Sequence, residues 1–149
     1  MKNTTILLFL LMSSVTYAQD KSASDFNLPK SRVAVQGYDV VSYFTQKKSI
    51  AGDKKFTITY DDVNFQFSSK ENLELFKINP TKYIPQYGGF CAYAIGKTGK
   101  KVDINPKTFE IRDGKLYLFY NSWGTNTLEL WLKEGAEKLQ KQADKNWKF

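Results

Sequence analysis

Two pairs of short segments with alternating apolar and polar residues dominate the hydrophobic pattern of this chain. In residues 56–60 and 63–67 every second side chain is apolar, and the Asp-Asp pair between them is typical of a turn. Residues 108–112 and 115–120 flank an Asp-Gly pair, which strongly favours a tight hairpin. Segment 115–120 is apolar on both faces, which is typical of a central strand. The pattern therefore predicts an antiparallel sheet built from β-hairpins.

Helical and extended patterns surround these hairpins. Residues 32–36 predict a short strand, and residues 38–44 fit one or two helical turns for which Asp39 would supply the N-cap. Ser68 and Glu71 form a capping-box pattern that opens another helix. A stripe of leucine and tryptophan after residue 125 predicts a C-terminal helix. Together these patterns indicate an α+β fold with segregated short helices and without an internal repeat.

The first eighteen residues have the organisation of a secretory signal peptide. Lys2 gives a positive start, residues 6–15 form an apolar run, and Thr16-Tyr17-Ala18 offers a small-residue cleavage site, so residues 1–18 are expected to be removed. The apolar run is too short to span a bilayer, and no integral membrane segment is expected after cleavage. Residues 19–30 predict a flexible lead-in and residues 31–149 a single domain. The protein is therefore expected to be periplasmic or secreted.

The amino-acid composition limits which metals, catalytic bases and partners the protein could use. The chain has no histidine, and both methionines lie in the predicted signal peptide. The mature protein would thus offer a soft metal only one thiol, Cys91, which argues against a structural zinc site. The lack of histidine also removes the commonest general base. The net charge of +7 comes from scattered lysine pairs, so no nucleic-acid partner is expected.

Residues 83–95 combine the cysteine with a glycine pair, a proline and three tyrosines. Gly88 and Gly89 would each cost about 1 kcal/mol inside a helix, so a close backbone approach or a bend is expected to require them. A helix that begins near them would place Cys91 in its first turn, where exposed N–H groups favour a thiolate. The alternative is a small buried thiol in a packing seam.

Several segments together resemble the YHS-domain family, in its small exported bacterial form, over nearly the whole mature chain. They are residues 37–44, 65–72, 79–83, 85–92 and 113–118, and the fourth reads Pro-Gln-Tyr-Gly-Gly-Phe-Cys-Ala. The resemblance implies a YHS-like fold and an association with heavy-metal handling, for which many members use clustered cysteines. Where those members carry cysteine, this chain has Phe67-Ser68-Ser69. The resemblance therefore implies the fold more directly than it implies metal binding.

Three functional hypotheses follow, and the first is a binding module for a small ligand or a metal ion near Cys91. An aromatic pocket with a few polar groups suits small ligands. Its candidate residues are Tyr38, Tyr43, Tyr87, Tyr93, Trp123, Asp39, Asp103 and Cys91. A weakly bound ion such as copper would use Cys91 together with carboxylates or a partner molecule.

The other two hypotheses are an accessory protein that binds an envelope partner and a thiol-dependent enzyme. An exposed aromatic patch would favour the accessory protein. The enzyme would use Cys91 as nucleophile, with an aspartate or a tyrosine in place of the missing histidine base. The sequence favours the binding module, then the accessory protein, then the enzyme.

Overall fold

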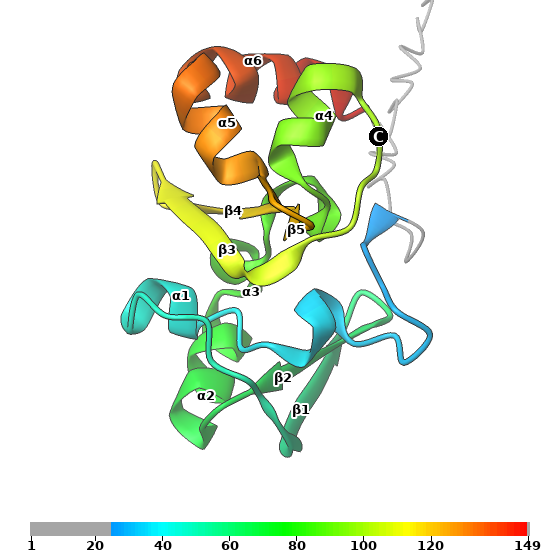
Figure 1. Cartoon of the computed structure of the whole chain (residues 1–149). Helices are drawn as coiled ribbons and strands as arrows, with labels where there is room; N and C mark the ends of the chain where they lie inside the picture. Colours follow the sequence, from blue (N-terminus) through cyan, green and yellow to red (C-terminus); the bar gives the residue numbers. More distant parts are fainter. Residues whose placement is uncertain (1–24, 149) are drawn as a thin grey trace, which may run out of the picture.

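The computed structural model describes residues 25–148, which fold into two units placed one above the other (Figure 1). The predicted α+β class is confirmed, with antiparallel hairpins, short helices and a C-terminal helix. The predicted signal peptide and the first half of the predicted lead-in, residues 19–24, lie outside the described residues. Within residues 25–148, no helix has the length and apolar character needed to cross a membrane.

The first unit spans residues 33–78 and is organised around one hairpin. Its elements are the 3-10 turn η2 (Ala34–Gly37), helix α1 (Ser42–Thr45), strands β1 (Asp53–Tyr60) and β2 (Val63–Phe67), and helix α2 (Lys70–Ile78). Helix α3 (Pro80–Tyr83) follows and leads into the second unit.

The second unit spans residues 85–134 and repeats this order with one insertion. Its elements are η3 (Gln86–Gly89), α4 (Ala92–Thr98), β3 (Asn105–Arg112), β4 (Lys115–Phe119), the small hairpin of β5 (Asn121–Ser122) and β6 (Thr125–Asn126), and α5 (Thr127–Glu134). A last helix, α6 (Ala136–Asn146), has no counterpart in the first unit. Gly135, with φ of 105°, separates α5 from α6.

The two units follow one backbone pattern with an offset of 52 residues. Turn η2 corresponds to η3, and hairpin β1–β2 to β3–β4 with equal strand lengths. Each hairpin has a register shift at the same position, after residue 53 in one and after residue 105 in the other. Within the described residues the fold is thus an internal repeat, and the expectation of none was wrong. Only five of the 33 residue pairs between 35–67 and 87–119 are identical, which hid the repeat.

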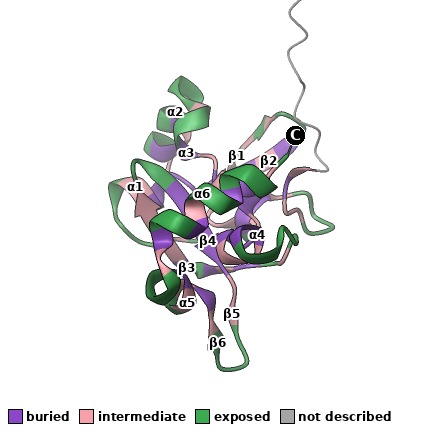
Figure 2. Ribbon diagram, turned by 90° about the horizontal axis from the view of Figure 1, so that it is seen from above, coloured by how far each residue is buried: buried purple, intermediate pink, exposed green. Residues whose placement is uncertain are grey.

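The prediction of a central strand also needs correction. Strand β3 is the only strand that pairs with β4 among the described residues, where every sheet has two strands, and a single parallel bridge joins Leu118 to Cys91. The two apolar faces of β4 instead serve two cores: Leu116 and Leu118 pack into the first, and Tyr117 and Phe119 into the second, where they contact Trp131. Figure 2 shows the buried positions running through the middle of the molecule. A strand between two cores carries the same sequence pattern as a strand inside a sheet.

Two local predictions are corrected by the structure. Residues 34–37 form the turn η2 and not a strand, because Val35 and Gln36 take left-handed conformations with φ of 50° and 54°. Helix α2 is capped by Ser69, whose Oγ accepts a hydrogen bond from the Asn72 amide over 3.1 Å. Ser68, the predicted cap, turns instead toward Asp39.

Candidate functional site

Cys91 lies in the core and not on a surface. It is fully buried at the N-cap of α4. Its Sγ lies 3.3 Å from the Thr127 hydroxyl and 3.4 Å from the Tyr120 amide nitrogen, which donates to it. The sequence suggested either a thiol at the start of a helix or a buried thiol in a packing seam. The structure places Cys91 at a helix start and also buries it. No solvent reaches the sulfur in this arrangement.

Asp39 occupies the position in the first unit that Cys91 occupies in the second. The amides of Asp39 and Cys91 make equivalent bonds, to the carbonyls of Ile50 and Val102. The buried carboxylate of Asp39 accepts hydrogen bonds from five donors. These are the amides of Val41, Ser42 and Ser68, the Ser68 hydroxyl and the Asn72 side-chain amide, at 2.6 to 3.3 Å. These hydrogen bonds satisfy a carboxyl group that is buried, and they join the start of α1, the end of the hairpin and α2 through Asp39.

The residues around Cys91 do not fit a copper ion. The thiol contacts a hydroxyl and an amide N–H, and neither is a soft ligand. Asp39 and Asp103 have other partners: Asp39 bonds within the first unit, and Asp103 accepts from Asn27 Nδ2 over 2.8 Å. Within residues 25–148, no group of three Cys, Asp or Glu side chains is arranged to hold a metal.

The other predicted site residues are dispersed. Tyr43 is buried and donates to the Pro106 carbonyl over 2.7 Å, and burial raises the pKa of its hydroxyl. Tyr38 and Asp103 line a shallow groove beside Tyr120. Tyr93 donates to Glu134 over 2.8 Å. Trp123 is 95% exposed at the tip of the β5–β6 hairpin. The expected single aromatic pocket therefore does not form from this set.

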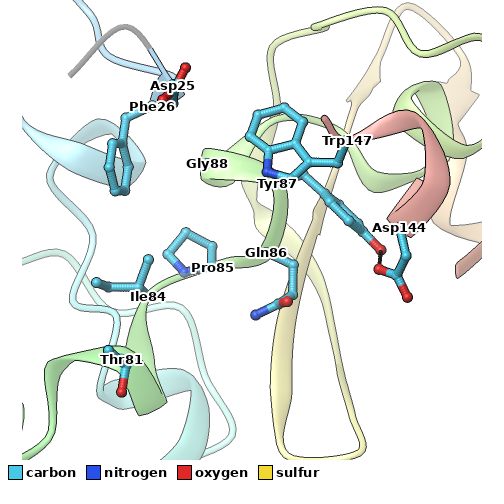
Figure 3. Close-up of a pocket in the computed structure, with 10 residues that line it drawn as sticks. All are labelled: Asp25, Phe26, Thr81, Ile84, Pro85, Gln86, Tyr87, Gly88, Asp144 and Trp147. Atoms are coloured by element: carbon cyan, nitrogen blue, oxygen red, sulfur yellow. Dashed lines mark hydrogen bonds between the residues drawn. The ribbon is translucent and has the colours of Figure 1, made fainter. Parts of the chain in front are cut away.

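One predicted residue, Tyr87, does line a cleft. The cleft has a volume of about 310 Å³ and lies between the start of the described chain, α3, η3 and the end of α6. We call it the Tyr87 cleft; its lining residues are Asp25, Phe26, Thr81, Ile84, Pro85, Gln86, Tyr87, Gly88, Asp144 and Trp147. In Figure 3 the rings of Tyr87 and Trp147 form one side, and Phe26, Ile84 and Pro85 the other.

A glycine brings the two walls of this cleft together. Gly88 has φ of 60°, and a Cβ at this position would lie 1.8 Å from the Asp25 carbonyl oxygen. The Asn27 amide donates to the Gly88 carbonyl over 2.8 Å, which fixes the segment before it against η3. The close backbone approach predicted for the glycine pair is therefore present at Gly88. It holds Phe26 in place as a wall of the cleft.

The far wall carries a coupled phenol and carboxylate. The Tyr87 hydroxyl donates to Asp144 Oδ1 over 2.8 Å, as the dashed line in Figure 3 marks. Burial, and then this hydrogen bond, raises the pKa of Tyr87 well above its usual range, so the phenol stays protonated. The rings of Tyr87 and Trp147 lie 6.0 Å apart, nearly edge to face. This wall therefore combines two aromatic rings with one carboxylate, which accepts the Tyr87 hydrogen bond at its edge.

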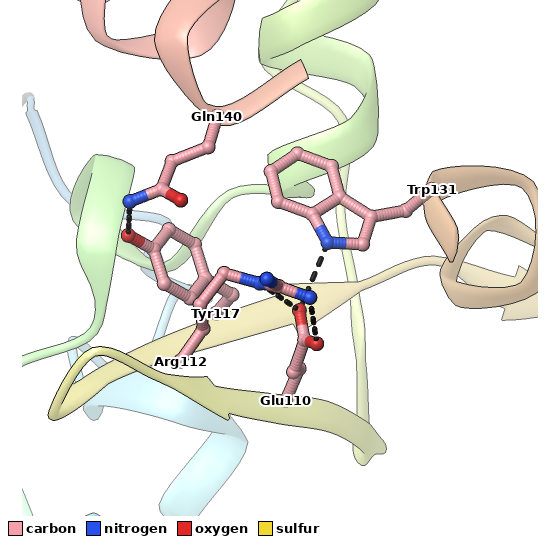
Figure 4. Close-up of polar contacts among 5 residues, drawn as sticks. All are labelled: Glu110, Arg112, Tyr117, Trp131 and Gln140. Carbon is pink, nitrogen blue, oxygen red and sulfur yellow. Dashed lines mark hydrogen bonds and ion pairs between the residues drawn. The ribbon is translucent and has the colours of Figure 1, made fainter. Parts of the chain in front are cut away.

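A second polar cluster has a structural explanation. The Glu110 carboxylate accepts from the Arg112 guanidinium over 2.7 Å and from Trp131 Nε1 over 2.9 Å, and Gln140 donates to the Tyr117 hydroxyl over 2.9 Å (Figure 4). These bonds attach α5 and α6 to the β3–β4 hairpin. By holding α6 in position, they also place Asp144 and Trp147 at the wall of the Tyr87 cleft.

Sequence reasoning found Tyr87 but missed its partners. Asp144 and Trp147 lie in a stretch that has the pattern of an ordinary charged helix end, and Phe26 lies in the predicted lead-in. One sequence feature could have indicated this wall of the cleft. Trp147 is a large aromatic residue that follows directly after a charged helical stretch. Comparison with protein-family models, with curated proteins and with solved structures finds no match to this chain.

Proposed function

We propose that this protein is an exported, YHS-like binding module and that the Tyr87 cleft is its ligand site. The observation that carries the proposal is the hydrogen-bonded Tyr87–Asp144 pair in a cleft with aromatic walls. Small-molecule sites are typically concave and largely apolar, with a few fixed polar groups and volumes of about 300 Å³ or more. The cleft is concave, has aromatic walls with fixed polar groups, and its volume of about 310 Å³ lies at the lower end of this range. Cys91 lies four residues after Tyr87 but does not line the cleft, so the ligand does not use the thiol.

The test is a screen of small fragments of mixed charge by NMR. Binding in the cleft is expected to shift the Gly88 amide and the Trp147 indole resonances. The Trp123 indole serves as an internal control, because this side chain is 95% exposed and reports nonspecific association. A screen in which no fragment shifts Gly88 and Trp147 more than Trp123 would overturn the proposal. Intact-mass analysis of exported protein tests the accompanying expectation of cleavage after Ala18.

A second candidate function is an envelope interaction protein, and the exposed Trp123 favours it. Tryptophan is enriched among residues that dominate protein interfaces. Its hairpin lies at the opposite end of the molecule from α2, whose Ile78 is also exposed, so the two do not form one patch (Figure 2). A photo-crosslinker at position 122 should capture one partner, and the Trp123→Ser variant should lose it. Equal capture from position 62, at the tip of the other hairpin, would count against this function.

A thiol-dependent enzyme has the least support. Cys91 is fully buried and contacts a hydroxyl and an amide, neither of which is a base. In the folded protein we expect iodoacetamide to modify Cys91 far more slowly than a free thiol. Modification at the rate of a free thiol would reopen this hypothesis.

A further inference from the structure

The charge of the Tyr87 cleft is opposite to that of the protein. The chain has 22 Lys and Arg against 15 Asp and Glu, a net charge of +7. The described residues that line the cleft include two carboxylates, Asp25 and Asp144, and no lysine or arginine. Two carboxylates and no cationic side chain in the lining make the cleft locally acidic on a basic protein, and this favours a cationic ligand.

The aromatic walls favour the same charge. Trp147 contributes one ring to the lining, and the Lys101 ammonium, which is not among the lining residues, lies 5.3 Å from the centre of that ring. Phe26 and Tyr87 contribute two more rings to the walls. Aromatic rings attract ammonium groups through their negative faces, and cages of such rings bind quaternary ammonium ligands.

The groups that line the cleft distinguish a metal ion from an organic cation. Calcium takes six to eight oxygen ligands and magnesium an octahedral oxygen shell. Within the described residues no group of three acidic or thiol side chains is arranged for a metal, and much of the cleft wall is carbon. An organic cation instead needs one or two carboxylates and an apolar surface for its methyl or methylene groups. We infer that the Tyr87 cleft binds a small organic cation, an amine or a quaternary ammonium compound; this rests on the proposed binding function.

The experiment compares choline with 3,3-dimethylbutan-1-ol, a neutral molecule of nearly the same shape. Both are titrated into the purified protein, expressed from the full chain, with the Gly88 amide and the Trp147 indole as NMR readouts. Choline is expected to bind at least about tenfold more tightly than the alcohol, because only choline gains the carboxylate and aromatic attraction. Calcium chloride is the third arm and is expected to leave both resonances unchanged.

Two variants with the same change in net charge locate the effect. Asp144→Asn keeps an oxygen that can accept from Tyr87 and should weaken choline binding about tenfold. Glu137→Gln removes a carboxylate from the same helix, where it pairs with Lys141 away from the cleft, and should leave affinity unchanged. The alcohol comparison uses the unmodified protein, so it stands even if Asp144→Asn folds poorly.

The outcomes separate this inference from the proposed function. Equal affinity for choline and the alcohol would overturn the cation inference and leave a ligand-binding cleft. Calcium binding that depends on Asp144 and exceeds choline binding would also overturn it. If choline fails while neutral or anionic fragments shift Gly88 and Trp147, only the cation inference falls. If no fragment of any charge shifts these resonances, the proposed function falls with it.

Discussion

The two units have the same backbone pattern but different side chains at its centre. In the first unit the buried carboxylate of Asp39 gathers five donors from the start of α1, the end of the hairpin and α2. In the second unit the smaller thiol of Cys91 contacts the Tyr120 amide and Thr127. Ser68 and Tyr120 are equivalent residues, so both centres accept the same backbone N–H. One backbone pattern thus accommodates a carboxyl group at one centre and a thiol at the other.

The difference shows where function is to be sought. The shared centres are buried and satisfied, and no buried side-chain nitrogen or oxygen within the described residues lacks a partner. The Tyr87 cleft instead uses parts that the repeat does not duplicate: α6, its C-terminal Trp147, and the segment before the first unit. Tyr87 itself corresponds to Val35, which has no hydroxyl to offer. The repeat supplies a scaffold, and the additions supply the site.

The largest effect is expected from truncating the two centres. Asp39→Ala should lower the free energy of unfolding by about 3 kcal/mol or more, because several buried donors lose their acceptor. Cys91→Ala leaves a small void and should cost about 1 to 2 kcal/mol. Urea denaturation of both variants measures the difference. Equal losses at the two positions would mean that the centres are alike in energy despite their chemistry.

A smaller effect is expected at the glycine that closes the cleft. Gly88→Ala should destabilise the protein by about 2 kcal/mol, because the new Cβ meets the Asp25 carbonyl and the backbone is left-handed there. Gly114→Ala is the matched control, with φ of 71° and no atom within 4 Å of the place that a Cβ would take, and should cost only about 1 kcal/mol. Thermal or urea unfolding checks both. A Gly88 variant no less stable than the Gly114 variant would mean that residues 25–27 do not pack against η3.

The tyrosines give a pH-dependent comparison between the units. Burial is the main cause that raises the pKa of Tyr43 in the first unit and of Tyr87 and Tyr117 in the second, Tyr117 to about 12. Since the folded state holds these protons more tightly, their stabilisation is complete below about pH 10 and is lost as the pH rises above it. The residues equivalent to Tyr87 and Tyr117 are Val35 and Phe65, which do not titrate.

Replacing the tyrosines of the second unit should therefore flatten this alkaline loss. Above about pH 10, Tyr87→Phe should reduce the slope of unfolding free energy against pH by about 1.4 kcal/mol per pH unit, the value for one proton. Tyr117→Phe should act similarly up to about pH 12. Urea melts between about pH 8 and about pH 12 measure the slopes. Unchanged slopes in both variants would show that burial does not raise the pKa of these two tyrosines.

Much of the fold could be predicted from local pattern. Alternating apolar residues and the turn residues between them located both hairpins, and the glycine pair correctly indicated a close backbone contact at Gly88. The repeat was not predictable, because it is preserved in backbone conformation while most side chains differ. Phe65 and Tyr117 are both buried aromatic residues, yet a letter-by-letter comparison counts them as a mismatch.

The candidate site was less predictable for a physical reason. Aromatic residues and buried acids look alike in sequence whether they line a cleft or fill a core, and Tyr43 and Asp39 belong to the core. The cleft depends on three distant segments, around Phe26, Tyr87 and Asp144, that meet only through tertiary packing. The lone cysteine is a reactive residue type, but its position in the fold removes it from solvent.

The most direct test compares equivalent positions of the two units during ligand titration. Choline is added while the backbone amides of Gly88 and of Gln36, its counterpart in η2, are followed by NMR. We expect a saturable shift at Gly88 and at the Trp147 indole, with Gln36 unchanged, because the elements that form the cleft are present only beside η3. A shift centred on Gln36, Tyr38 and Asp103 with none at Gly88 would contradict a ligand site in the Tyr87 cleft.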